Sequence, residues 1–141
     1  MKFFLDTDTL SLLFHQHPKI LSRFRSIGNG DATAITIVTR IELLRGRFDH
    51  LLKAATKVEW LAAQARLIAD EREIAGYEIV LADEAAADHL VRLRSLKKLK
   101  KVGLADLMIA SIALANQATL VTRNVKDFQP IPGLTLENWA D

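Results

Sequence analysis

The sequence predicts an α/β fold in which helices cover both faces of a central, mainly parallel sheet. Short apolar or β-branched segments alternate along the chain with longer segments of helical periodicity, and strands separated by helices pair in parallel. The 141 residues are 50% hydrophobic and 26% charged, which is sufficient for one hydrophobic core. We therefore expect a three-layer α/β/α sandwich formed by a single domain, residues 1–141.

The composition excludes several classes of protein. The chain contains no cysteine, so a disulfide scaffold, a thiolate metal site and a cysteine nucleophile are excluded. No apolar segment approaches the roughly 18 residues that a membrane span needs, and acids interrupt the first apolar stretch, unlike in a secretory signal. The net charge of +2 is compatible with a nucleic-acid substrate. These features predict a cytoplasmic protein without a membrane segment.

The first half of the chain predicts two strands, each followed by helices. Apolar or β-branched runs predict strands at Lys2–Leu5 and Thr33–Val38. Pro18 is typical of the first position of a helix, and Gly46 of the residue after a helix. Together with helical periodicity, these signals predict three helices: Thr9–His15, Lys19–Ile27 and Thr39–Arg45.

The second half predicts three further strands around a strongly apolar helix. The alanine-rich segment Leu51–Glu73 is typical of two helices in a hairpin. Asp83 can cap a helix that extends to Leu96, and Gly103 opens the apolar helix that ends near Asn116. The remaining apolar segments predict these strands, the last at an edge: Glu78–Leu81, Thr119–Thr122 and Leu134–Leu136.

Four acidic residues fall at the ends of these predicted elements: Asp6, Glu42, Asp106 and Asp127. In a parallel sheet, the carboxyl ends of strands and the N-termini of the following helices share one edge, where ligands bind. This rule places Asp6, Glu42 and Asp127 together. The helix of Asp106 leads into the fourth strand, so we expect its N-terminus near the opposite end unless it packs across the sheet edge.

Simpler explanations exist for three of these acids. Asp6 or Asp8 can cap the first helix. Glu42 lies three residues after Thr39, which matches a capping box. Asp127 lies in a turn-like segment, where an acid is common. For each of these residues alone, a local structural role is the simpler interpretation.

Asp106 is the hardest of the four acids to explain by local structure. It is the only ionisable residue between Lys101 and Arg123, and a helix that is apolar all round is a buried helix. A buried carboxylate costs several kcal/mol unless it is paired or metal-bound. Several carboxylates brought together would raise one another's pKa. A Mg²⁺ or Mn²⁺ ion would remove that conflict, and could activate water for displacement at phosphorus.

Four segments stand in a characteristic order along the chain: LDTDTLS, TRIELLRG, GLADLMIASIALANQATLVTRNVKDF and PGLTLENW. In this order they resemble a PIN-domain ribonuclease, and most closely the VapC-type toxin subunits of bacterial toxin–antitoxin systems. The resemblance covers nearly the whole chain. It implies a PIN-like sandwich, a Mg²⁺- or Mn²⁺-dependent endoribonuclease, and packing that brings Asp106 to the other acids.

The resemblance also assigns roles by position. Three residues match the central acids of the family: Asp6, Glu42 and Asp106. Some family members have a fourth acid at the position of Asn124, and others at the position of Asp127. In this chain only Asp127 can provide that carboxylate to the metal, whereas Asn124 could offer a carbonyl oxygen or orient a water molecule. Thr7 and Thr122 are candidates for contacts with phosphate or with the metal ligands.

The partners that the resemblance implies are an RNA substrate and a cognate antitoxin. A homodimer, or a hetero-oligomer with the antitoxin, is expected. Apolar side chains on the first two helices could form the antitoxin groove or a dimer face, or belong to the core: Leu10, Leu13, Phe14, Ile20, Leu21 and Phe24. The basic run Lys97–Lys101 could contact RNA phosphates or be a solvated helix end. His15 and His17 have a metal-like spacing, but their position before Pro18 favours a surface role.

Two competing functions are also compatible with the sequence. Asp6-Thr7-Asp8-Thr9 resembles the DxDxT motif of haloacid-dehalogenase-type phosphatases, in which Asp6 would be the nucleophile and Asp8 the general acid/base. The segment around Asp106 does not match the second acidic motif of that family, and the chain is short for it. A non-catalytic RNA-binding module is the other alternative. Clustered carboxylates argue against it, because they add nothing to the binding of RNA.

Overall fold

The computed structural model describes residues 1–141 and contains one sheet of five strands, all of them parallel. The strands stand in the order β3-β2-β1-β4-β5. Their bounds are β1 Lys2–Leu5, β2 Ala32–Thr36, β3 Glu78–Val80, β4 Thr119–Val121 and β5 Thr135–Glu137. The predicted α/β class with a central parallel sheet is thereby confirmed.

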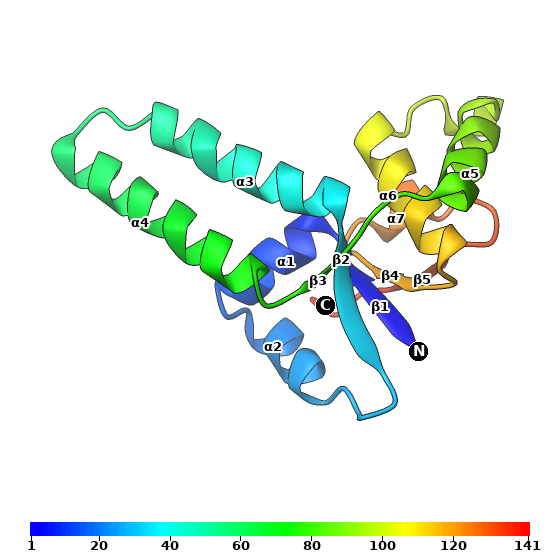
Figure 1. The fold of residues 1–141 in the computed structure, drawn as a ribbon, viewed down its shortest axis with the longest axis horizontal. Helices are drawn as coiled ribbons and strands as arrows, with labels where there is room; N and C mark the ends of the chain where they lie inside the picture. Colours follow the sequence, from blue (N-terminus) through cyan, green and yellow to red (C-terminus); the bar gives the residue numbers. More distant parts are fainter.

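Helices cover both sides of this sheet (Figure 1). α1, α2 and the long hairpin of α3 and α4 lie on one side, and α5, α6 and α7 on the other. No helix is long and apolar enough to cross a membrane. The helical segments, including one short 3-10 helix η1, are α1 Thr7–Phe14, α2 Pro18–Arg25, α3 Ile37–Leu52, α4 Lys57–Ile74, α5 Glu84–Arg94, η1 Lys97–Leu99, α6 Leu104–Ala115 and α7 Val125–Phe128.

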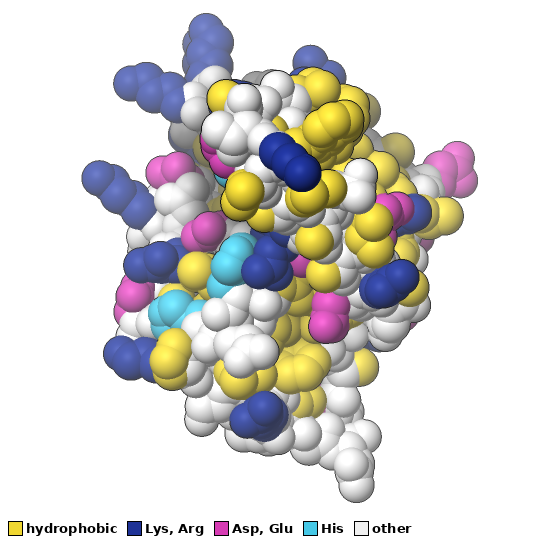
Figure 2. All heavy atoms as spheres, turned by 90° about the vertical axis from the view of Figure 1, so that its left-hand side faces the viewer, with side chains coloured by type: hydrophobic (Ala, Val, Ile, Leu, Met, Phe, Trp, Pro, Cys, Tyr) yellow, Lys and Arg dark blue, Asp and Glu magenta, His cyan; other side chains and the backbone are white.

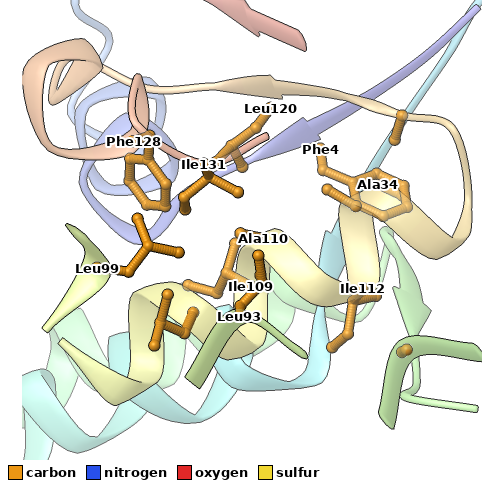
Figure 3. Packing of buried hydrophobic residues seen from close by; sticks show 14 residues of the cluster. Phe4, Ala34, Leu93, Leu99, Ile109, Ala110, Ile112, Leu120, Phe128 and Ile131 are labelled. Carbon is orange, nitrogen blue, oxygen red and sulfur yellow. The ribbon is translucent and has the colours of Figure 1, made fainter. Parts of the chain in front are cut away.

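Alternation along β1 divides the core into two layers. Phe3 and Leu5 pack with the residues of α1 and α2, whereas Phe4 packs with those of α6. Figure 3 shows the second layer, in which Ile109 and Ala110 of α6 lie beneath the strands. Because β1 is buried on both faces, its sequence is a continuous apolar run rather than an alternating one.

The third helix differs most from the prediction. α3 extends over Ile37–Leu52, and its N-cap is Thr36, whose hydroxyl accepts a hydrogen bond from the Thr39 amide at 3.1 Å. The predicted capping box of Thr39 and Glu42 is therefore wrong, and Gly46 lies inside the helix. A helical glycine costs only about 1 kcal/mol relative to alanine, which packing against α4 outweighs. The predicted hairpin is present, but α3 itself is its first helix.

A buried carboxylate joins this hairpin to α1. Asp70 of α4 is 1% exposed, and it accepts a hydrogen bond from Nε of Arg47 on α3. Nη2 of Arg47 also donates to Oγ of Ser11 at 2.9 Å. Nη1 of Arg66 lies 3.7 Å from Oδ1 of Asp70, an oxygen that accepts no hydrogen bond. One acid and two arginines thus connect three helices.

Candidate active site

The candidate site lies where β1 and β4 are neighbours at the centre of the sheet. The helices that follow β1 and β4 cover opposite faces of the sheet, and in parallel sheets ligands bind at the carboxyl ends of two such strands. Asp6 follows β1, and its amide donates to the Val121 carbonyl of β4 at 3.0 Å. Thr122 follows β4 and is 1% exposed. The sheet therefore holds both residues in fixed positions at its edge.

Asp6 is both a helix cap and a buried acid. Its Oδ1 accepts a hydrogen bond from the Thr9 amide at 2.8 Å, which confirms the predicted N-cap of the first helix. Burial raises the pKa of Asp6 above its ordinary value of 3.8, and hydrogen bonds from Thr122 and Thr9 partly oppose that shift. Capping uses one carboxylate oxygen, so it does not by itself prevent a second role.

Asp106 lies near the other acids, contrary to the expectation from the sheet rule alone. α6 enters β4 directly and runs antiparallel to it, so its N-terminus lies at the carboxyl edge of the sheet. The 12 residues of α6 span roughly 18 Å, which is longer than the three-residue strand β4. Burial raises the pKa of Asp106 first, followed by the negative charges of Glu42, Asp6 and Asp127. The expected position at the opposite end was therefore wrong.

Glu42 is held in place by a residue of α1. Oγ1 of Thr7 donates a hydrogen bond to Oε1 of Glu42 at 2.6 Å. Its other carboxylate oxygen makes no hydrogen bond within the protein. Thr7 therefore orients the Glu42 carboxylate and links the first turn of α1 to the second turn of α3.

Asn124 and Asp127 form a second polar pair after β4. Nδ2 of Asn124 donates to Oδ2 of Asp127 at 2.8 Å, and the Asn124 amide donates to Oγ1 of Thr122 at 2.9 Å. The sequence predicts a turn in this segment, whereas the structure contains the short helix α7 here. Asn124 thus connects an exposed carboxylate to the hydroxyl beside Asp6.

The donor set at this edge of the sheet consists of carboxylate, amide and hydroxyl oxygens, which hard divalent cations prefer. No three acidic or histidine side chains approach closely enough to enclose a metal ion. Mg²⁺ fits such a site, since it commonly keeps several water molecules and binds through one or two carboxylates. The mutual repulsion at Asp106 would be relieved by a cation bound beside it.

Other residues singled out in the sequence have separate places. Asp8 is exposed in the first turn of α1. Nδ1 of His17 accepts a hydrogen bond from the Ile20 amide, so this histidine caps α2. In the basic run, Leu99 is buried in the core and the lysines on either side of it are exposed. An RNA contact by these lysines stays a prediction.

The polar network of Arg47, Asp70 and Arg66 was not predicted from the sequence. The only local signal is the spacing of four residues between Arg66 and Asp70 on one helix. Arg47 lies on a part of α3 that the analysis placed outside the helix, so its neighbours could not be inferred.

Comparison with known proteins identifies the family of this chain. Residues 3–133 match the PIN-domain family. The tRNA(fMet)-specific endonuclease VapC of Salmonella typhimurium is 32% identical over 143 residues, with 99% of each chain covered. Ribonuclease VapC2 of Rickettsia felis is 29% identical, with 99% of this chain and 98% of the relative covered.

Solved structures of this group have the same fold. A chain in the crystal structure of DNA-bound VapBC from Salmonella typhimurium superimposes with a TM-score of 0.81 at 30% identity, covering 99% of this chain and 98% of that chain. VapBC2 from Rickettsia felis, bound to a DNA fragment from its promoter, gives a TM-score of 0.78 at 29% identity, with 99% of each chain covered. The chain therefore belongs to the PIN-domain family and, within it, to the VapC-type ribonucleases of toxin–antitoxin systems.

Proposed function

We propose that this ribonuclease is a metal-dependent endonuclease whose site is formed by Asp6, Glu42, Asp106 and Asp127. The observation that carries the proposal is the electrostatic position of Asp106, whose pKa is raised by burial and by the other three acids. A folded protein retains such a repulsive arrangement at a cost in stability, which a bound cation would offset.

Asp6 at the strand edge and Asp106 at the N-terminus of α6 would hold a Mg²⁺ or Mn²⁺ ion. Such an ion would supply Lewis-acid polarisation of the phosphodiester and a lowered pKa for an attacking water molecule. The Glu42 carboxylate is oriented by Thr7, which leaves one oxygen without a protein hydrogen bond. Asp127 is oriented in the same way by Asn124. Thr122 stabilises the ionised form of Asp6.

The test is cleavage of RNA with Mg²⁺ and in excess chelator. We expect cleavage only with the metal, and no release of phosphate from small phosphoesters. Asp8→Asn should retain RNA cleavage, because Asp8 is exposed outside the proposed donor set. Phosphate release that depends on Asp8 would instead support the phosphatase alternative, and metal-dependent RNA binding without cleavage would support a binding module.

Asp127 is proposed as the fourth acid, and a matched pair of variants tests this. Asp127→Asn removes a charge, so we expect the Mg²⁺ concentration for half-maximal cleavage to rise roughly tenfold. Asn124→Ala should have a smaller effect, because it removes only the amide that orients Asp127. Metal titrations of the cleavage rate compare the two variants. A larger effect of Asn124→Ala at every Mg²⁺ concentration contradicts the assignment.

The RNA substrate is proposed from the relatives. The Salmonella typhimurium protein is a tRNA(fMet)-specific endonuclease at 32% identity. We therefore propose that this chain cleaves a structured RNA, with the initiator tRNA as the first candidate.

We also propose that an antitoxin binds this chain, because the related structures include VapBC and toxin–antitoxin complexes. A cavity of about 240 Å³ lies between α1, α2 and the end of α4. It is lined by Leu21, Phe24 and Tyr77, and Phe14 and Phe24 each contact the Tyr77 ring. Burial raises the pKa of Tyr77 to about 12, so its hydroxyl stays protonated.

This groove corrects the set of apolar residues expected to face a partner. Leu10 and Ile20 are fully buried, and Leu13 is 7% exposed, so all three are chiefly core residues. Phe14, Leu21 and Phe24 remain partly exposed at the cavity. An amphipathic antitoxin segment could pack here, with an arginine extending to the acids of the site. The homodimer stays a prediction.

The groove is tested by Phe24→Asp, which places a charge on the apolar surface. We expect the variant to lose co-purification with its antitoxin while RNA cleavage stays unchanged, because Phe24 lies outside the proposed metal site. Lys19→Asp is the matched control, since Lys19 is an exposed residue of the same helix outside the cavity. Thermal melting verifies that both variants fold. A folded Phe24→Asp variant that binds the antitoxin normally places the groove elsewhere.

A further inference from the structure

A polar cavity lies between the end of α1 and the hairpin of α3 and α4. Its volume is about 550 Å³, and its polar lining consists of two arginines and two histidines with no acid: Arg47, Arg66, His15 and His50. Gly46 and two alanines complete the lining. Figure 2 shows the side of the molecule at which the hairpin loop lies, with histidine side chains beside Lys and Arg side chains in the middle of this face. We call this cavity the arginine pocket.

Most hydrogen-bond donors in the arginine pocket have no partner within the protein. Arg47 uses Nε and Nη2 for Asp70 and Ser11, which leaves Nη1 free. Arg66 makes no hydrogen bond, because its nearest contact with Asp70 is 3.7 Å. With one buried acid against two arginines, the pocket keeps a net positive charge before either histidine is considered.

The two histidines add polar ring nitrogens to the lining. Nδ1 of His15 lies 2.7 Å from the Ser11 carbonyl, so it carries the proton there and Nε2 is the free nitrogen of the ring. His50 makes no hydrogen bond to the protein and lines the same cavity. Free guanidinium donors in a planar fork are the groups that best match the oxygens of a phosphate.

Gly46 supplies a second, independent observation. It lies inside α3, where glycine costs about 1 kcal/mol relative to alanine. A Cβ at this position would meet no atom within 4 Å, so no neighbour in the fold requires the glycine. The missing side chain instead keeps the pocket open and lets a ligand approach the helix closely.

The pocket and part of the proposed catalytic site lie along the same two helices, α1 and α3. On α1, Ser11 and His15 follow Thr7 at intervals of four residues, and on α3, Gly46 and His50 follow Glu42 in the same way. Two side-chain hydrogen bonds join the helices, one from Thr7 to Glu42 and one between Ser11 and Arg47. Eight helical residues place the pocket roughly 12 Å from the acids, or roughly three stacked nucleotides.

We propose that the arginine pocket binds a backbone phosphate of the RNA substrate about three nucleotides from the bond that is cleaved. This inference rests on the proposed function, because it assigns a substrate contact outside the metal site. RNA is favoured over a protein segment, since the only apolar side chains in the lining are two alanines, which offer no anchor for a peptide.

Arg66→Ala is the first test, because this arginine forms no hydrogen bond in the fold and its side chain is 42% exposed. For an RNA that extends at least five nucleotides on each side of the cleaved bond, we expect KM to rise about tenfold with kcat unchanged, as for the loss of one charge-assisted contact. The salt dependence of KM should become shallower by about one charge. For a dinucleotide that contains only the cleaved bond, kcat/KM should be unchanged.

Two further variants make the result specific. Arg72→Ala removes the same charge from an exposed position of α4 outside the pocket, and should change neither substrate. Gly46→Leu fills the pocket without changing any charge, and should reproduce the selective effect on the long RNA with equal or higher thermal stability. Equal effects on both substrates, or equal effects of Arg66→Ala and Arg72→Ala, would overturn the proposal.

A binding measurement separates this proposal from the proposed function. Anisotropy of a labelled single-stranded RNA is measured in excess chelator, where no cleavage occurs. If the parent cleaves no RNA, the proposed function fails, but a selective tenfold loss of RNA affinity in Arg66→Ala still supports the pocket. If Arg66→Ala keeps full RNA affinity but loses the antitoxin, the pocket binds protein and the inference is wrong.

Discussion

Asp106→Asn is expected to lower RNA cleavage by roughly a thousandfold and to leave the fold intact. The substitution removes a charge that the proposed site uses for the metal, where preorganised charges contribute most to rate. The amide keeps nearly the same size and shape, so the N-terminus of α6 should pack as before. Asp6→Asn should lower cleavage similarly, because it also removes a charge from the proposed metal site. It should leave the fold intact, because asparagine caps a helix as well as aspartate does.

Stability in metal-free buffer provides a separate measurement of the same repulsion. The pKa of Asp106 is raised in the folded state above its ordinary value of 3.8, so the folded protein binds more protons than the unfolded chain in the window above that value. The free energy of unfolding of the parent therefore falls as pH rises through this window. Asp106→Asn should flatten this dependence and raise stability at pH 7.

Urea denaturation between pH 4 and 7, with and without Mg²⁺, measures both effects. Asp88→Asn on the exposed part of α5 is a control for the loss of a charge elsewhere. Retention of full cleavage by Asp106→Asn would contradict the metal mechanism. A parent protein whose stability rises with pH across this window would contradict the electrostatic account of the site.

Asp70→Ala should destabilise the protein by roughly 3–5 kcal/mol, the range for removing one partner of a buried ion pair. Asp70 is 1% exposed, and its removal leaves the Arg47 guanidinium, only 17% exposed, without an opposite charge. The link from Arg47 to Ser11 of α1 should weaken as well. Urea denaturation with circular dichroism provides the free energy of unfolding.

Replacing both Arg47 and Asp70 separates the effect of an unpaired buried charge from the effect of lost packing. Arg47→Met combined with Asp70→Leu should be more stable than Asp70→Ala, because no unpaired charge remains in the interior. Asp49→Ala on the exposed face of α3 should change stability by less than about 0.5 kcal/mol. A loss below about 1 kcal/mol for Asp70→Ala would show that water reaches this carboxylate.

The elements with strong local signals were predictable from the sequence. The apolar run of β1 and the helix start at Pro18 lie within one residue of the prediction. Helix α3 was not predictable in the same way, since Gly46 is a local signal for a helix end and only packing against α4 overrides it. Local propensity and tertiary packing disagreed there, and packing determined the result.

The candidate site was predictable in part. Asp6 and Asp127 follow strands, so the edge rule of parallel sheets places them together. The position of Asp106 depends on the direction of α6 relative to β4. The sequence-based expectation placed the N-terminus of this helix at the wrong end of the sheet. The network around Asp70 could not be predicted for another reason. Arg47 contacts both Asp70 and Ser11 only because three helices pack together.

The order of strands has a consequence for the synthesis of this chain. β1 is made first but lies at the centre of the sheet, and its neighbour β4 begins only at Thr119. The four acids can therefore come together only after Asp127, near the end of the polypeptide, has been synthesised. A nascent or truncated chain on the ribosome has no assembled site, and contacts so distant in sequence form slowly. A cell that translates this message would thus have an interval in which a partner can bind before the nuclease exists.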